Sequence, residues 1–286
     1  MALNVLFGAD LTERSRAALK TAYAFAGKTG GTLRILHVAD PELPPDYLRF
    51  EAEQAEAMLI SWTAPYRNRD VDVSISVMAE EAGPAFEEAC RDGMTDLIVM
   101  GRPRRDKRPW LFRGSTIEQV VSSVDVPVLC ASRGQAPPYL RPLVAAGLSG
   151  DDGRLVRASR RFALIDAEEV YAVHGAGGLT AAQMSYAGVS DAEYHSNLED
   201  RHRRLLGQLH SQLSEGGLTA PGQAVILDVP AATAISDAAA AFSADLAIVG
   251  FRKRDGLARL VKRPTALTVL QMSPIDVLMV PLSSLD

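Results

Sequence analysis

The stretch "TDLIVMGRPRRD", Thr95–Asp106, returns later in the chain in altered form as "ADLAIVGFRKRD", Ala244–Asp255. The two passages lie 149 residues apart, and this spacing holds without a gap as far as "VPVLCA" (126–131) and "IDVLMV" (275–280). Each passage opens with a short apolar run, which is typical of a strand buried on both faces, and continues into a basic loop. The chain therefore repeats a unit that contains at least two such strands.

The beginning of the unit is repeated as well. "LNVLFGAD" (3–10) matches "LRPLVAAG" (140–147), and His37 matches His174, both at a spacing of 137 residues. The difference between 149 and 137 means that the second copy has gained 12 residues in its middle. A repeat that matches at both ends predicts two homologous domains. We place them at residues 1–134 and 140–286, with a linker at 135–139 inside a Pro- and Gly-rich stretch.

Each copy alternates strands with helical patterns. The stretch from Thr12 to the glycine pair at 30–31 has a capping residue at its start and glycine at its end, which predicts a helix. A second helical pattern covers 50–66, with Ala55, Leu59 and Trp62 on one face. Alternation of this kind predicts a doubly wound, five-stranded parallel sheet with α/β topology in each copy. The first copy's strands are expected at Asn4–Ala9, Thr32–Ala39, Val71–Met78, Asp96–Gly101 and Val126–Ala131.

Composition and charge exclude several classes of protein. The chain has 286 residues, 47% of them hydrophobic, and a net charge of −5. Neither half is basic overall, so nucleic acid is not expected as a partner despite the arginines after Gly101. No apolar run approaches the ~20 residues that span a bilayer, and we expect a cytoplasmic protein without a membrane association. Cys90 and Cys130 form no CxxC pair and are expected to be reduced and buried.

Ligands of open parallel sheets bind beyond the carboxyl ends of the strands. In the first copy those ends carry Asp10, Val38 and Gly101, and the basic loop follows Gly101. At its far end, "GST" (114–116) precedes another helical pattern. Glycine permits close backbone approach, and a helix that opens at Ser115 offers free N–H groups to an anion.

On these residues each half resembles a domain of the universal stress protein family, and the chain resembles the family's tandem form. The end of the family's first strand is commonly Val-Asp-Gly-Ser, and "GADLTERS" places Asp10 at the aspartate. Nucleotide-binding members carry Gly-x2-Gly-x9-Gly-Ser/Thr after the fourth strand. Those positions are Gly101, Arg104, Gly114 and Ser115, so the spacing is kept and one glycine has become arginine.

The resemblance implies a nucleotide site in the first domain, with ATP or AMP as ligand and Mg²⁺ as a companion of ATP. Asp10 would contact adenine, with Val38 packed beside it. The phosphates would be held by the loop residues Gly101, Arg104, Gly114, Ser115 and Thr116.

The second domain departs from this pattern. Its aspartate position is Gly147, and its loop positions are Gly250, Lys253, Arg263 and Pro264. Pro264 has no N–H to offer, and Arg263 adds bulk where a glycine is expected. No family-type nucleotide site is predicted there. The enlarged middle of this domain, including the helical pattern at 193–213, is a candidate for a pocket or lid of its own.

Several single residues have two readings. Arg104 either pairs with phosphate through its guanidinium or fills the space that phosphate would need. Asp10 either contacts a ligand or caps the following helix, as Thr12 could also do. His37 and His174 lie within apolar strands and read as core histidines.

The remaining histidines and the motif content give no sign of a reaction. His195, His202 and His210 share a helix with charged residues and read as a solvated face, so we expect no metal site. No GxSxG, HExxH or GxxxxGK[ST] motif occurs, and Ser115 has no identifiable base. We therefore expect no catalytic residues and at most slow ATP hydrolysis.

Two functions remain open. The first is a nucleotide-binding protein with a regulatory or stress-response role, as the resemblance implies. The second is a scaffold or small-ligand-binding protein that acts through an unknown protein partner. The resemblance also implies that the two domains pair within the chain through their fifth strands, Val126–Ala131 and Ile275–Val280, which would protect two sheet edges. A homodimer of the whole chain is a further possibility on which the sequence is silent.

Overall fold

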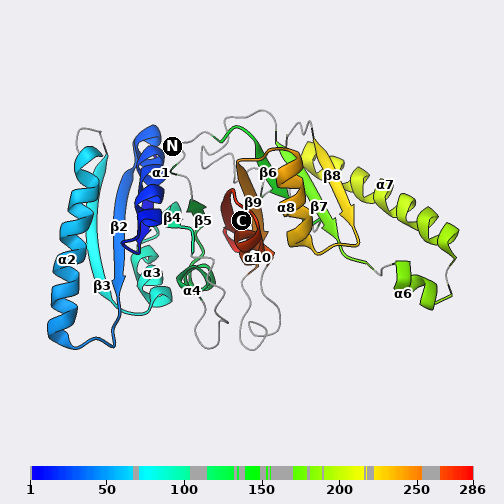
Figure 1. Cartoon of the computed structure of the whole chain (residues 1–286). Coiled ribbons are helices and arrows are strands. Elements are labelled where there is room, and N and C mark those ends of the chain that lie inside the picture. The colour runs from blue at the N-terminus through cyan, green and yellow to red at the C-terminus, as the bar shows by residue number, and fades with distance from the viewer. Residues whose placement is uncertain are drawn as a thin grey trace. The chain divides into compact units, whose positions relative to one another are not determined.

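The computed structural model describes residues 2–66, 71–103, 115–131, 134, 139–148, 153, 155, 170–178, 181–188, 190–215, 217, 222–252 and 265–285. The chain divides into two compact units, with the main division between Pro137 and Pro138. Both units have the predicted α/β architecture (Figure 1).

The first unit contains a sheet with the strand order β3-β2-β1-β4-β5. Its neighbouring strands pair in parallel, as the alternation of helices and strands predicts. The predicted strands are confirmed apart from small shifts at their ends. They are β1 (Val5–Ala9), β2 (Thr32–Ala39), β3 (Asp72–Ala79), β4 (Leu97–Gly101) and β5 (Val128–Ala131).

Helices connect these strands and bury their apolar faces against the sheet. Helix α1 begins where predicted, since the Thr12 side chain accepts from the N–H of Ser15, and it ends at Gly30 in the left-handed conformation. Helix α2 begins earlier than predicted, because Pro45 fits the first helical turn, where its missing N–H has no intrahelical partner. The helices are α1 (Glu13–Thr29), α2 (Pro45–Thr63), α3 (Ala82–Cys90) and α4 (Thr116–Ser123), with a short 3₁₀ turn at Ala64–Tyr66.

The second unit repeats this topology with the order β10-β9-β6-β7-β8. Its strands are β6 (Pro142–Ala145), β7 (Tyr171–Ala176), β8 (Gln223–Leu227), β9 (Leu246–Phe251) and β10 (Asp276–Pro281). The enlarged middle forms two helices between β7 and β8, and the long α7 packs mainly on β8 (Figure 1). The described helices are α6 (Ala181–Tyr186), α7 (Asp191–Glu215), α8 (Ala231–Ala241) and α10 (Thr265–Met272), with a final 3₁₀ turn at Leu282–Leu285.

Each unit has an equivalent hydrogen bond at the amino edge of its own sheet. In the first unit, the N–H of Asn4 donates to Asp96 Oδ2 at 2.9 Å. In the second, the N–H of Arg141 donates to Asp245 Oδ1 at 3.0 Å. Asp96 and Asp245 are matched by the repeat, and each fixes the entry to the first strand of its unit.

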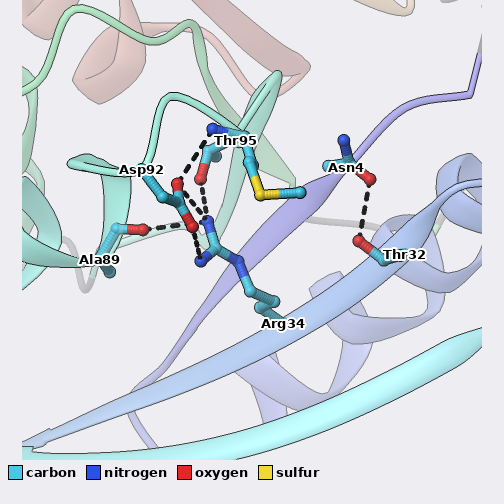
Figure 2. A network of polar contacts seen from close by, with 7 residues as sticks. Asn4, Thr32, Arg34, Ala89, Asp92 and Thr95 are labelled. Atoms are coloured by element: carbon cyan, nitrogen blue, oxygen red, sulfur yellow. Dashed lines mark hydrogen bonds and ion pairs between the residues drawn. The ribbon is translucent and has the colours of Figure 1, made fainter.

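The first unit adds a polar network around Arg34 at this same edge (Figure 2). The Arg34 guanidinium donates to Asp92 Oδ2 at 2.7 Å and to the Ala89 carbonyl at 2.9 Å, and it also donates to the Thr95 hydroxyl. The N–H of Met94 and the Arg34 guanidinium together lower the pKa of the Asp92 carboxyl. Each group is paired within the network, which ties the α3–β4 connection to β2 and reads as structural.

The end of the predicted linker belongs to the core of the second unit. Tyr139 is buried, and its hydroxyl donates to Asp276 Oδ2 at 2.8 Å. Burial, together with the Asp276 charge, raises the pKa of Tyr139 well above its usual range. The Pro- and Gly-rich sequence around Tyr139 predicted a linker. Its hydrogen-bond partner lies 137 residues away in the chain, so no local pattern indicated the contact.

Candidate functional site

Three predicted site residues lie together at the carboxyl edge of the first sheet. Strand β1 pairs with β2 so that Ala9 lies opposite His37, and the next residues are Asp10 and Val38. Strand β1 also pairs with β4, with Gly8 opposite Met100, which brings Gly101 to the same level. Asp10 is exposed, and Val38 and Gly101 are half-buried. The structure thus brings Asp10, Val38 and Gly101 to one edge, on three adjacent strands.

The Asp10 carboxylate is held in place by the turn that follows it. Its Oδ1 accepts from the N–H of Thr12 at 3.0 Å and from the Thr12 hydroxyl at 2.7 Å. Thr12 itself caps α1, so the alternative reading of Asp10 as the helix cap is wrong. Among the described residues, Asp10 Oδ2 has no hydrogen-bond partner. The site therefore presents a fixed carboxylate with one oxygen available as an acceptor.

Packing against α1 favours glycine at position 101, whatever its role toward a ligand. A Cβ at this position would lie 3.0 Å from Ser15 Cα and 3.1 Å from Ser15 N. These are backbone atoms of the first turn of α1, which cannot move aside without shifting the helix. The glycine thus allows α1 to approach the end of β4 closely.

Ser115 and Thr116 begin α4. The Ser115 hydroxyl accepts from the N–H of Glu118 at 3.2 Å, and Glu118 Oε2 accepts from the N–H of Ser115 at 2.8 Å. This reciprocal capping box takes the first N–H that the sequence offered to a phosphate. The predicted residues Arg104 and Gly114 lie outside the described residues, and the phosphate contacts stay a prediction.

The two matched histidines make the same bond in both units. His37 Nδ1 donates to the Ala9 carbonyl at 2.8 Å, and His174 Nδ1 donates to the Ala146 carbonyl at 2.9 Å. Ala9 is the last residue of β1, and Ala146 directly follows the last residue of β6. His37 is buried as predicted, whereas His174 is half-buried.

In the second unit, helix α8 packs against the carboxyl edge of the sheet that corresponds to the Asp10 edge of the first unit. Gly147 stands at the place of Asp10, and Gly175, in β7, stands at the place of Val38. A Cβ at Gly175 would lie 2.8 Å from both Ala231 Cα and Ala234 Cβ of α8. Helix α8 therefore packs directly on β7 where the first unit has a side chain. Lys253, Arg263 and Pro264 lie outside the described residues.

A different polar cluster occupies the carboxyl ends of β7 and β8. Asp228 follows β8 in the left-handed conformation, at φ 59°, and its Oδ2 accepts from the Tyr194 hydroxyl at 2.6 Å. Arg201 donates to the Gly177 carbonyl at 2.7 Å, and its Nη1 lies 3.8 Å from Asp228 Oδ1. The hydrogen bond to Asp228 raises the pKa of Tyr194. The cluster ties α7 to the ends of both strands.

Sequence reasoning did not single out this cluster. Asp228 follows a largely apolar strand, β8, as Asp10 follows β1, and this is the signal that could have found it. Tyr194 and Arg201 carry no such signal, because only the packing of α7 brings them to β8.

An open groove of about 440 Å³ lies beside the cluster. Its lining combines apolar and charged side chains of α7 with the last residue of β8, namely Leu198, Glu199, His202, Arg203, Leu206 and Leu227. His195, His202 and His210 are exposed, as the predicted solvated face requires. Within the described ranges, no three His, Cys, Asp or Glu side chains come together as a metal site would need.

Comparison with known proteins gives the family. The sequence model of the universal stress protein family matches residues 1–132 and 138–281. The chain belongs to the universal stress protein family. It is a tandem member, because the match occurs twice along the sequence.

Two solved structures share this tandem universal stress protein fold over the whole chain. A universal stress protein from Archaeoglobus fulgidus is 17% identical, with a TM-score of 0.68, covering 99% of this chain and 100% of its own. A Pseudomonas aeruginosa protein of unknown function is 17% identical, with a TM-score of 0.64, covering 99% of this chain and 96% of its own. None of the curated proteins compared with the chain matches it.

Two further properties of this universal stress protein bear on the predictions. Cys90 and Cys130 are not joined by a disulfide; Cys130 is buried as predicted, whereas Cys90 is only half-buried, so the prediction of burial is wrong for Cys90. None of the described helices combines the length and apolar character that a membrane-spanning segment requires.

Proposed function

We propose that the first unit of this universal stress protein binds an adenine nucleotide, ATP or AMP, and that the protein acts in regulation or stress response without defined catalysis. The observation that carries the proposal is the fixed Asp10 carboxylate at the end of β1, with Oδ2 available beside half-buried Val38. The exocyclic amine of adenine is a donor that such an oxygen accepts from, and the valine offers an apolar surface to the ring. Action in the cytoplasm stays part of this proposal.

The phosphates would extend toward Gly101 and the start of α4. The loop between them is strongly basic in sequence, so it supplies charge of the required sign. The Ser115 hydroxyl and the residues around Gly114 would complete the cradle, with Mg²⁺ accompanying ATP.

Calorimetric titration with adenosine, AMP and ATP tests the proposal. Asp10→Ala should weaken all three ligands by about 10- to 100-fold, because each loses a hydrogen bond to a charged group. Asp40→Ala is the matched control, since Asp40 is another exposed aspartate at this sheet edge and accepts from the N–H of Glu42. No binding of any of the three ligands at millimolar concentration would overturn the proposal.

Substitutions of Arg104 test whether its side chain binds the phosphates or blocks their site. If its guanidinium grips phosphate, Arg104→Ala should weaken ATP relative to adenosine by about 1–3 kcal/mol. If instead it fills the site, Arg104→Gly should bind ATP more tightly than the parent protein does. Adenosine serves as the internal control in both cases, because it carries no phosphate.

A second candidate function is supported by the second unit. The Tyr194–Asp228–Arg201 cluster and the groove beside it lie at the sheet edge where ligands of this fold class bind. They favour recognition of another small ligand or of a protein partner there. This function is favoured if the protein binds no adenine compound but does bind another ligand or protein, and if Arg201→Ala abolishes that binding.

We further propose that the two units pair within the chain through β5 and β10. Exposed strand edges are prone to pair with other chains, so mutual pairing would protect both. A homodimer of the whole chain would show as a doubled mass in light scattering.

A further inference from the structure

One side-chain bond connects the two strand ends that carry the proposed nucleobase residues. His37 Nδ1 donates to the carbonyl of Ala9 at 2.8 Å. Ala9 immediately precedes Asp10, and His37 immediately precedes Val38. The bond thus joins the residue before Asp10 to the residue before Val38.

The turn after Ala9 needs such a restraint. Leu11 has a φ of 57°, in the left-handed region that a residue with a Cβ disfavours. Backbone in this region persists where its surroundings fix it. Here Asp10 Oδ1 fixes the turn from one side through Thr12, and the His37 bond fixes the carbonyl of Ala9 on the other.

The second unit repeats the combination. His174 donates to Ala146 at 2.9 Å, and Leu148, at the matched position, has a φ of 54°. The residues at the places of Asp10 and Val38 are both glycine in this unit. The histidine bond and the left-handed leucine thus occur together twice, and they persist where the ligand residues have been lost.

The chemistry of the ring agrees with a fixed donor. A carbonyl oxygen only accepts, so Nδ1 must carry the hydrogen. Among the described residues, the buried Nε2 has no hydrogen-bond partner, and the nearest carboxylate oxygen, Glu51 Oε1, lies 3.8 Å away. The ring is therefore oriented by its bond to Ala9 and by packing, and not by a second hydrogen bond in this part of the structure.

We propose that His37 is a positioning residue: its bond to Ala9 holds the left-handed turn at Leu11 and so places Asp10 beside Val38 for the ligand. His174 performs the same structural task in the second unit, without a site to serve. The effect of the His37 bond on the turn concerns the fold alone, whereas the placement of Asp10 for a ligand rests on the proposed nucleotide site.

Nuclear magnetic resonance of the ligand-free protein tests whether the His37 bond holds the turn at Leu11. In His37→Leu, we expect the φ-dependent coupling and amide shifts of Leu11 and Thr12 to change, while those of Leu148 stay as they are. His174→Leu should do the reverse, and it is the matched control. His37→Gln keeps a side-chain donor, should restore part of the signature, and covers the case in which His37→Leu does not fold. Unchanged signals at Leu11 in a folded variant that lacks the donor would overturn the proposal.

A second substitution separates positioning from general stability. Glycine adopts the left-handed conformation without a steric penalty, so Leu11→Gly removes the need for a restraint. His37→Leu should weaken adenosine binding by about three- to tenfold in the parent chain, as loss of one neutral hydrogen bond predicts. In the Leu11→Gly background the loss should be smaller. An equal loss in both backgrounds would show that His37 acts through stability alone.

The two failures are distinguishable. If the parent protein binds no adenine compound, the proposed function fails, and the resonance signals of Leu11 still decide the role of His37. If the parent protein binds and His37→Leu binds equally well with an altered turn, the proposed function stands and the positioning role toward the ligand is wrong.

Discussion

The carboxyl edges of the two sheets show how one fold can keep its framework and change its site. In the first unit, Asp10 and Val38 extend from neighbouring strands, and Asp10 keeps an oxygen available. In the second, glycines stand at both places, and α8 occupies the space above Gly175. The backbone features beneath, a histidine bond and a left-handed leucine, are the same in both. The residues that shape the turn are thus separable from those offered to a ligand.

The difference between the units extends to what replaces the site. The second unit brings Tyr194 and Arg201 from α7 to Asp228, at the end of its edge strand. At the corresponding ends of the first unit, exposed Asp40 follows β2 and half-buried Glu80 follows β3. The 12 added residues of the second copy therefore coincide with a new polar cluster, and the two edges can serve different partners.

The largest effect on stability is expected from replacing Gly175 of the second unit with valine, the residue at the matched position 38 of the first unit. Gly175→Val places a branched side chain against Ala231 and Ala234, where even a Cβ is too close. Overpacking of this kind should lower the free energy of unfolding by about 3 kcal/mol. Urea unfolding followed by circular dichroism measures the change.

Gly177→Ala is the control for this comparison. A Cβ at Gly177 meets nothing within 4 Å, so the substitution should change the unfolding free energy by less than about 0.5 kcal/mol. If Gly175→Val is tolerated equally well, α8 does not fill the second unit's edge as we describe.

The next largest effect concerns a pair that the first unit lacks. Tyr139 and Asp276 are buried together, whereas the matched positions of the first unit are Ala2 and Pro127. Tyr139→Phe removes a hydrogen bond to a charged group and should destabilise the second unit by about 1.5–3 kcal/mol. Both tryptophans, Trp62 and Trp110, lie in the first half, so their fluorescence follows that half and circular dichroism follows both. A shift confined to fluorescence would contradict the prediction.

The smallest effect belongs to the amino edge of the first unit. Asp92→Asn breaks the ion pair with Arg34, which is partly exposed, and should cost at most about 1 kcal/mol at neutral pH. The N–H of Met94 and the Arg34 guanidinium lower the pKa of Asp92 below its ordinary 3.8. Its contribution is therefore complete above that value and is lost as the pH falls through the lowered pKa.

Unfolding of the parent and Asp92→Asn proteins at several pH values checks this sign. The difference between the two should shrink on acidification and vanish at the lowest pH. Asp200→Asn is the matched control, because Asp200 forms an exposed pair with Arg203 in the second unit. A difference that grows as the pH falls would show that the sign is wrong.

Much of the fold was predictable because it rests on local patterns. The five strands of the first unit follow from apolar runs, and Thr12 and Gly30 delimit α1 as their capping chemistry predicts. Tyr139 was misread as linker, because Pro and Gly around it outweighed one aromatic residue. Sequence alone could not separate Asp10 from Thr12 as the cap of α1, and the structure gives the cap to Thr12.

The sequence by itself determined the duplication, the α/β class and the family, because repeats and apolar periodicity are written residue by residue. Only the tertiary structure decided that Asp10, Val38 and Gly101 follow three adjacent strands, that α8 packs over Gly175, and that Tyr194 and Arg201 reach Asp228. The reason is physical. Strand register and helix packing join residues far apart in the chain, and such contacts depend on the shape of both partners, which no single stretch of sequence records.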